Sequence, residues 1–166
     1  MITIMETQIK VSHQRVALKS NFDSFVKSIE TVLNRLNPDW PSGLLSDPEA
    51  VKQHLTKVAG DTGLMIFGQQ EHGKLLAIKG KPGKIIQYII GNPLTAVEMT
   101  QHDIRAALYA PLRVIFYEGE DQVLYAEYDL PSSLFGQFGN EEILAVSKGL
   151  DKKLFDAILL ADQKSN

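Results

Sequence analysis

The clearest candidate for chemistry in this sequence is a pair of opposite charges on a predicted hairpin, Arg113 and Glu127. The runs "PLRVIFYE" and "QVLYAEYDL" are rich in β-branched and aromatic residues, and they flank Gly119-Glu120-Asp121, a three-residue loop that contains glycine. Centring the turn on Glu120 predicts a register that pairs Tyr117 with Val123, Ile115 with Tyr125, and Arg113 with Glu127, all on one face. We expect the other face to pack on helices.

Two readings of that charged pair remain open. On an exposed sheet face it would be a surface salt bridge that contributes about 0.2 to 1 kcal/mol. If a loop or a second subunit covers the face, Arg113 and Glu127, with Tyr117 and Tyr125 beside them, would bind an anion or a carboxylate.

Other catalytic patterns are weaker. A serine nucleophile at Ser132 or Ser133 would need a nearby base such as His102, whereas serine hydroxyls in a connection commonly satisfy backbone groups. The four histidines share no metal-ligand spacing, so we expect no metal site and no cofactor. The sequence has no GxSxG motif and no phosphate-binding glycine loop, and "GKPGK" reads as a turn between strands.

Composition excludes several classes of protein. A chain of 166 residues with 44% hydrophobic and 22% charged residues fits a single globular domain, residues 1–166. The net charge of −3 and the dispersed basic residues argue against nucleic-acid binding. The sequence has no cysteine, no apolar run long enough to span a membrane and no secretory signal pattern, so we expect a soluble, cytoplasmic protein without a membrane partner.

The elements that must position these side chains follow from periodicity. Helical spacing of apolar residues predicts helices over 20–37, 46–60 and 140–161, with a short helix after Asn92-Pro93. The runs "GLMIFGQ", "KLLAIKG" and "KIIQYIIGN" predict three strands separated by tight turns. Strands in adjacent hairpins with grouped helices predict an α+β fold, with an antiparallel sheet covered by helices on one face.

The run "IIGNPLTAVEMTQHDIRAALYAPLRVIFYE", followed by "YDLPSSLFGQFGNEEI", resembles the bacterial domain-of-unknown-function family 302. The likeness covers roughly residues 21–161 and is strongest over 89–138. It implies a curved antiparallel sheet wrapped against a long C-terminal helix, similar to a TATA-binding-protein-like or helix-grip fold. DNA binding does not follow from such a fold, because fold does not dictate function.

The resemblance also singles out polar positions, none of which has a role assigned by the family. Together with Tyr125 on the hairpin, they are our candidate ligand-binding residues: Asn92, His102, Asp103, Tyr109, Arg113, Tyr125, Glu127, Asp129, Ser132 and Ser133. No catalytic residue is assigned.

We therefore favour a small-ligand-binding or regulatory module without catalysis, a homodimer that takes a small organic or anionic ligand between sheet and C-terminal helix. One alternative is an enzyme that uses general acid–base chemistry, with His102 or Glu127 carrying the proton and Arg113 holding an anion. Another is a structural homodimeric interaction protein.

Overall fold

The computed structural model describes residues 2–40 and 42–165, and their strands form one six-stranded sheet. All neighbouring strands are antiparallel except β2 and β3, which run parallel. In spatial order the strands are β1 (His13–Leu18), β6 (Leu124–Asp129), β5 (Leu112–Glu118), β4 (Ile85–Gly91), β3 (Met65–Gln70) and β2 (Asn34–Arg35).

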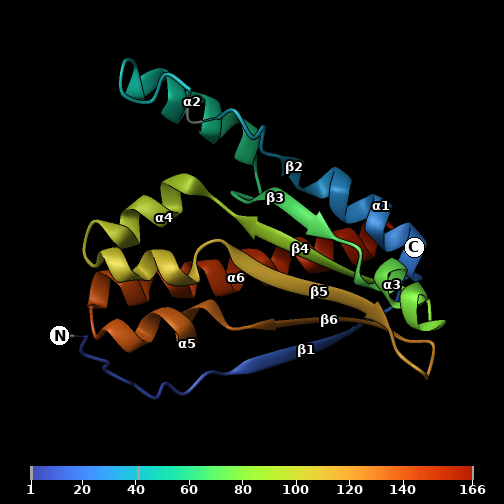
Figure 1. Ribbon diagram of the computed structural model, residues 1–166. Coiled ribbons are helices and arrows are strands. Elements are labelled where there is room, and N and C mark those ends of the chain that lie inside the picture. The colour runs from blue at the N-terminus through green and yellow to red at the C-terminus, as the bar shows by residue number, and fades with distance from the viewer. Residues whose placement is uncertain (1, 41, 166) are drawn as a thin grey trace.

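Helices pack against one face of this sheet (Figure 1). The helices are α1 (Phe22–Val32), α2 (Pro48–Ala59), α3 (His72–Leu75), α4 (Pro93–Thr100), α5 (Pro131–Phe135) and α6 (Glu141–Lys164), with 3₁₀ segments η1 (Leu76–Lys79), η2 (Ile104–Tyr109) and η3 (Gly136–Phe138). The long helix α6 crosses behind β4 and β5, as Figure 1 shows. The predicted mixed α+β fold with a long C-terminal helix is confirmed.

Alternation along the strands explains why one face is buried. In β5, Leu112, Val114 and Phe116 point into the core, where Phe116 packs against Phe25 of α1 with ring centroids 4.8 Å apart. The intervening residues Arg113, Ile115 and Tyr117 lie half-buried or exposed on the opposite, outer face of the sheet. The period of two thus divides β5 and its neighbour β6 between core and surface.

The hydrophobic core consists of two clusters. The main cluster lies between the sheet and helices α1 and α6, and Phe25, Tyr88 and Leu154 are among its fully buried members. A smaller cluster lies under α2 and contains Leu36, Val51, Leu55, Ala59 and Met65, with Trp40 and Phe67 packed against it. The cavity described below opens where these two clusters meet.

The predicted hairpin is correct in its faces and wrong in its register. In the structure Ile115 pairs with Glu127 and Tyr117 pairs with Tyr125, so the strands are shifted by two residues from the predicted pairing. Arg113 is therefore not opposite Glu127. A shift of two residues leaves every side chain on its predicted face, because side chains alternate with a period of two.

Two further predictions need correction. The run "KLLAIKG" is not a strand, because Leu75 ends α3 and Leu76–Lys79 form η1. The C-terminal helix does not fray after Ala161 but continues to Lys164, since Asp162 is buried there and binds the backbone near β1. Within the described ranges, no helix is long and apolar enough to cross a membrane.

Candidate functional site

The segment from β4 to β5 builds the edge of a cavity at one end of the sheet. Gly91 ends β4, and the side chain of Asn92 then caps α4 by accepting the backbone N–H of Leu94 at 2.9 Å. The Asn92 amide also donates to the carbonyl of Gly63 at 3.0 Å. Through these two bonds Asn92 ties the end of β4 and the start of α4 to Gly63 at the cavity wall.

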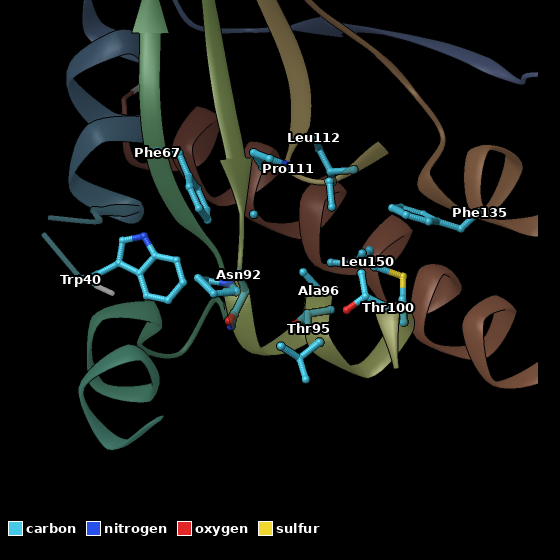
Figure 2. Close-up of a pocket in the computed structure, with 15 residues that line it drawn as sticks. Trp40, Phe67, Asn92, Thr95, Ala96, Thr100, Pro111, Leu112, Phe135 and Leu150 are labelled. Atoms are coloured by element: carbon cyan, nitrogen blue, oxygen red, sulfur yellow. The ribbon is translucent and has the colours of Figure 1, made fainter. Parts of the chain in front are cut away.

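The cavity has a volume of about 300 Å³ and a mainly apolar wall. Figure 2 shows Trp40 and Phe67 at one end, Phe135 at the other, and Thr95 and Ala96 of α4 along one side. Leu112, Met99 and Leu150 come from the main core cluster, whereas Trp40 and Phe67 come from the smaller one. The cavity thus occupies the junction of two cores that do not fully interpenetrate.

None of the described residues that line this apolar cavity has an ionisable side chain. Its side-chain polar groups are the Trp40 indole, the Asn92 amide and the hydroxyls of Thr95 and Thr100. Ligand sites are commonly apolar clefts with a few polar groups that fix orientation. The arrangement can hold an apolar molecule, but it offers no group suited to proton transfer.

A second cavity of about 610 Å³ lies on the other side of the segment Ala110–Leu112, which lines both cavities. Three of the candidate residues meet here, namely Tyr109, Arg113 and Asp129. The guanidinium of Arg113 is exposed, and no described residue forms a hydrogen bond or an ion pair with it. We call this second cavity the Arg113 groove.

Glu127 lies instead in a charged network on the outer face of β1, β5 and β6. Its carboxylate accepts from the Tyr117 hydroxyl at 2.5 Å and from His13 Nε2 at 3.0 Å, and it pairs with Arg15 Nε at 3.0 Å. The hydrogen bonds from Tyr117 and His13 hold the pKa of Glu127 below its usual value. The Arg15 guanidinium stacks 3.9 Å from the Tyr125 ring centroid.

His13 bridges two carboxylates in this network. Its Nδ1 lies 3.0 Å from Asp129 and its Nε2 lies 3.0 Å from Glu127. Hydrogen bonds first to Asp129 and then to Glu127 raise the pKa of His13, because only the charged ring can donate from both nitrogens. No cluster of the described residues has the geometry to hold a metal ion.

The remaining candidate residues have structural contacts. The side chain of Asp103 caps η2 and binds Arg105, while His102 is exposed and lines neither cavity. The Ser133 hydroxyl donates to the Leu130 carbonyl and accepts the Ser12 N–H, and the backbone of Ser132 donates to Asp151. The Ser133 hydroxyl thus binds backbone groups, whereas the contact of Ser132 is made by its backbone N–H.

Sequence reasoning missed residues of each site. It did not identify Trp40 or Phe67 as site residues, because nothing local links them to Pro111, which lies close to Phe67 beside Gly91. It also missed His13 and Arg15, since β1 pairs with β6 across more than a hundred residues of chain. The sequence of β1, with three polar residues followed by three apolar ones, has no alternation that would have indicated a strand.

Comparison with known proteins agrees with the fold. A crystal structure of an uncharacterised conserved DUF302 protein from Bacillus stearothermophilus superposes with a TM-score of 0.64 at 13% identity, over 90% of this chain and 97% of that one. Among curated proteins, none matches. The model of the family "Domain of unknown function DUF302" matches residues 43–159. The chain therefore belongs to the bacterial-type family DUF302.

Proposed function

We propose that the protein is a ligand-binding or regulatory module without catalysis, which takes a small and mainly apolar organic molecule in the apolar cavity. The observation that carries the proposal is the wall of that cavity, in which aromatic and aliphatic side chains surround about 300 Å³ and no described lining residue is ionisable. Burying apolar ligand surface contributes about 25 cal/mol per Å², so such a site favours apolar molecules. The likeness to TATA-binding-protein or helix-grip folds stays a prediction.

The enzyme alternative has less support. A general base works best with a pKa near the working pH, whereas the hydrogen bonds from Tyr117 and His13 lower the pKa of Glu127. His102 lines neither cavity, and no contact with a described residue joins it to Glu127.

The first experiment is native mass spectrometry of the purified protein, compared with its denatured mass. A reproducible extra mass on the folded species supports the proposal and identifies the ligand class. Trp40 gives an independent assay, because it is the only tryptophan of the chain and lines the cavity. Titration with decanol, an uncharged apolar probe, should shift the emission of Trp40.

A variant that fills the cavity gives the matched test. Ala96→Leu places a larger side chain into the cavity from α4 and should abolish the response to decanol. Ala145→Leu makes the same change on the exposed face of α6 and should respond like the wild type. If both variants bind decanol like the wild type, the cavity is not the binding site.

Self-association is a second proposal, supported by the outer sheet face. Ile85 and Ile89 of β4 and Ile115 of β5 are only half-buried there. Two copies related by a two-fold axis would place these apolar residues against each other, since such an axis brings the same patch of both subunits together. Native mass spectrometry reports the oligomeric state, and Ile115→Lys should turn a dimer into a monomer.

A further inference from the structure

The Arg113 groove adds a charged neighbour to the apolar cavity. Ala110, Pro111 and Leu112 line both, so this segment forms a wall of each. The groove also contains Asp129, whose carboxylate binds His13 Nδ1 at 3.0 Å. Arg113, in contrast, has no hydrogen-bond or ion-pair partner among the residues that the structure describes. The uncommitted charge in the groove is therefore positive.

Pro111 lines both cavities, and Arg113 lies two residues farther along the chain, near the start of β5. Their Cα atoms are therefore at most about 7 Å apart. Pro111 lies over Gly91 at the edge of the apolar cavity, where a β-carbon on that glycine would come within 3.1 Å of the proline ring. A molecule that leaves the apolar cavity across Pro111 next meets the guanidinium of Arg113.

The chemistry of an arginine selects the group that would bind there. A guanidinium presents planar donors that match the two oxygens of a carboxylate, and such charge-assisted pairs are among the stronger hydrogen bonds in proteins. Tyr109, whose ring packs against Phe135 and Phe138, supplies an aromatic wall to the same groove. Among the described residues, the groove thus offers an unpaired cation next to apolar surface.

We propose that the ligand is an amphipathic carboxylate, with its apolar part in the apolar cavity and its carboxylate on Arg113 across Pro111. This inference rests on the proposed function, since it names the class of ligand for the same site. It adds a specificity-determining residue outside the cavity that holds most of the ligand. An uncharged molecule of the same length lacks the contact with Arg113 and binds more weakly.

The test compares decanoate with decanol by the fluorescence of Trp40 in the wild type and in Arg113→Gln. Wild-type protein should bind decanoate at least about tenfold more tightly than decanol, and Arg113→Gln should remove this difference while leaving decanol unchanged. Arg113→Lys keeps the charge but loses the planar donors, so it should fall between the two. Arg105→Gln removes the same charge from a residue that lines neither cavity, and should retain the wild-type preference.

A measurement on the unaltered protein keeps the test independent of how the variants fold. Added salt should weaken the binding of decanoate and leave the binding of decanol unchanged, because salt screens an exposed ion pair. Equal affinities for decanoate and decanol in the wild type, both abolished by Ala96→Leu, would overturn the role of Arg113 and retain the apolar site. If Ala96→Leu binds either probe as tightly as the wild type does, the apolar cavity is not the binding site.

Discussion

Asp162, near the end of α6, accepts the backbone N–H of Ser20 at 2.9 Å, so the C-terminal helix is tied to the segment between β1 and α1. The same carboxylate accepts the backbone N–H of Lys19 at 3.0 Å and the hydroxyl of Ser20. Both Ser20 and Asp162 are buried. One side chain therefore satisfies backbone donors that would otherwise lose their water partners without replacement.

Replacing this carboxylate should destabilise the fold. Asp162→Ala leaves the buried amide of Ser20 and the part-buried amide of Lys19 without this acceptor, and we expect a loss of about 2 kcal/mol in the free energy of unfolding. Urea denaturation followed by circular dichroism measures the change. Asp156→Ala, at an exposed position on the same helix, should stay within about 0.5 kcal/mol of the wild type. An equal loss of unfolding free energy in the two variants would show that the contacts of Asp162 do not stabilise the fold more than those of an exposed residue.

The bridge formed by His13 makes stability depend on pH in a defined direction. Folding raises the pKa of His13, so protonated His13 stabilises the folded state. This stabilisation is complete below the unfolded pKa of 6.5 and is lost as the pH rises through the folded pKa. Glu127 acts in the opposite sense, since its lowered pKa stabilises the fold above 4.5 and loses this effect in acid. More than half of the His13 side chain is exposed, so solvent weakens its contribution.

The corresponding prediction is a difference between melting temperatures. Wild-type protein should melt at a lower temperature at about pH 9 than at about pH 6, and His13→Gln should reduce this difference. His54→Gln, on the exposed side of α2, is the control and should retain the wild-type difference. An unchanged difference in His13→Gln would rule out the bridge as its source.

Local patterns predicted the elements of this protein better than their partners. Asn92 and Pro93 were correctly expected to end a strand and start a helix, because capping depends on neighbouring residues. The candidate residues, in contrast, divide among the apolar cavity, the Arg113 groove, the outer network and structural contacts. Which strands lie side by side depends on contacts distant in sequence, and one chain read alone does not display them.

The hairpin shows why the position of a single turn was predicted wrongly. Its loop closes with Gly119 N–H donating to the Val123 carbonyl at 2.9 Å, and Gln122 has a φ of 63° within it. The prediction centred the turn on Glu120, since glycine near a short loop favours a tight turn. The three-residue loop thus lies one residue farther along the chain than predicted, over Glu120–Gln122. A glutamine in the left-handed region is uncommon, so residue type gave no sign of this position.

The strain at Gln122 leads to a third prediction. Gln122→Gly removes the steric cost of a positive φ and should raise the free energy of unfolding by about 0.5 kcal/mol, after the greater freedom of glycine in the unfolded chain is subtracted. Glu120→Gly, in the same loop, relieves no positive φ and should lower stability by a similar amount. Chemical denaturation of both variants distinguishes these opposite signs. A loss at both positions would mean that Gln122 is not strained.

The fourth prediction concerns the segment that sequence periodicity assigned wrongly. "KLLAIKG" contains four consecutive apolar residues, yet Leu75 and Ile78 are largely exposed and the segment coils into α3 and η1. Gly73 explains why the chain can turn here, because it lies against the backbone of Gly83, whose N–H donates to the Gly73 carbonyl at 3.1 Å. A β-carbon at Gly73 would collide with the carbonyl oxygen of Gly83.

Gly73→Ala should therefore force these two backbone segments apart. Overpacking in a closely packed region costs about 1 to 3 kcal/mol, and the collision here is with backbone that has no alternative rotamer. Gly68→Ala is the matched control, since a β-carbon at Gly68 in β3 meets no atom within 4 Å and alanine suits a strand better than glycine. Thermal denaturation should show a lower melting temperature for Gly73→Ala and an equal or higher one for Gly68→Ala. Melting of Gly73→Ala at the wild-type temperature would mean that the segment moves aside without cost, and that its contact with Gly83 does not hold α3 against the start of β4.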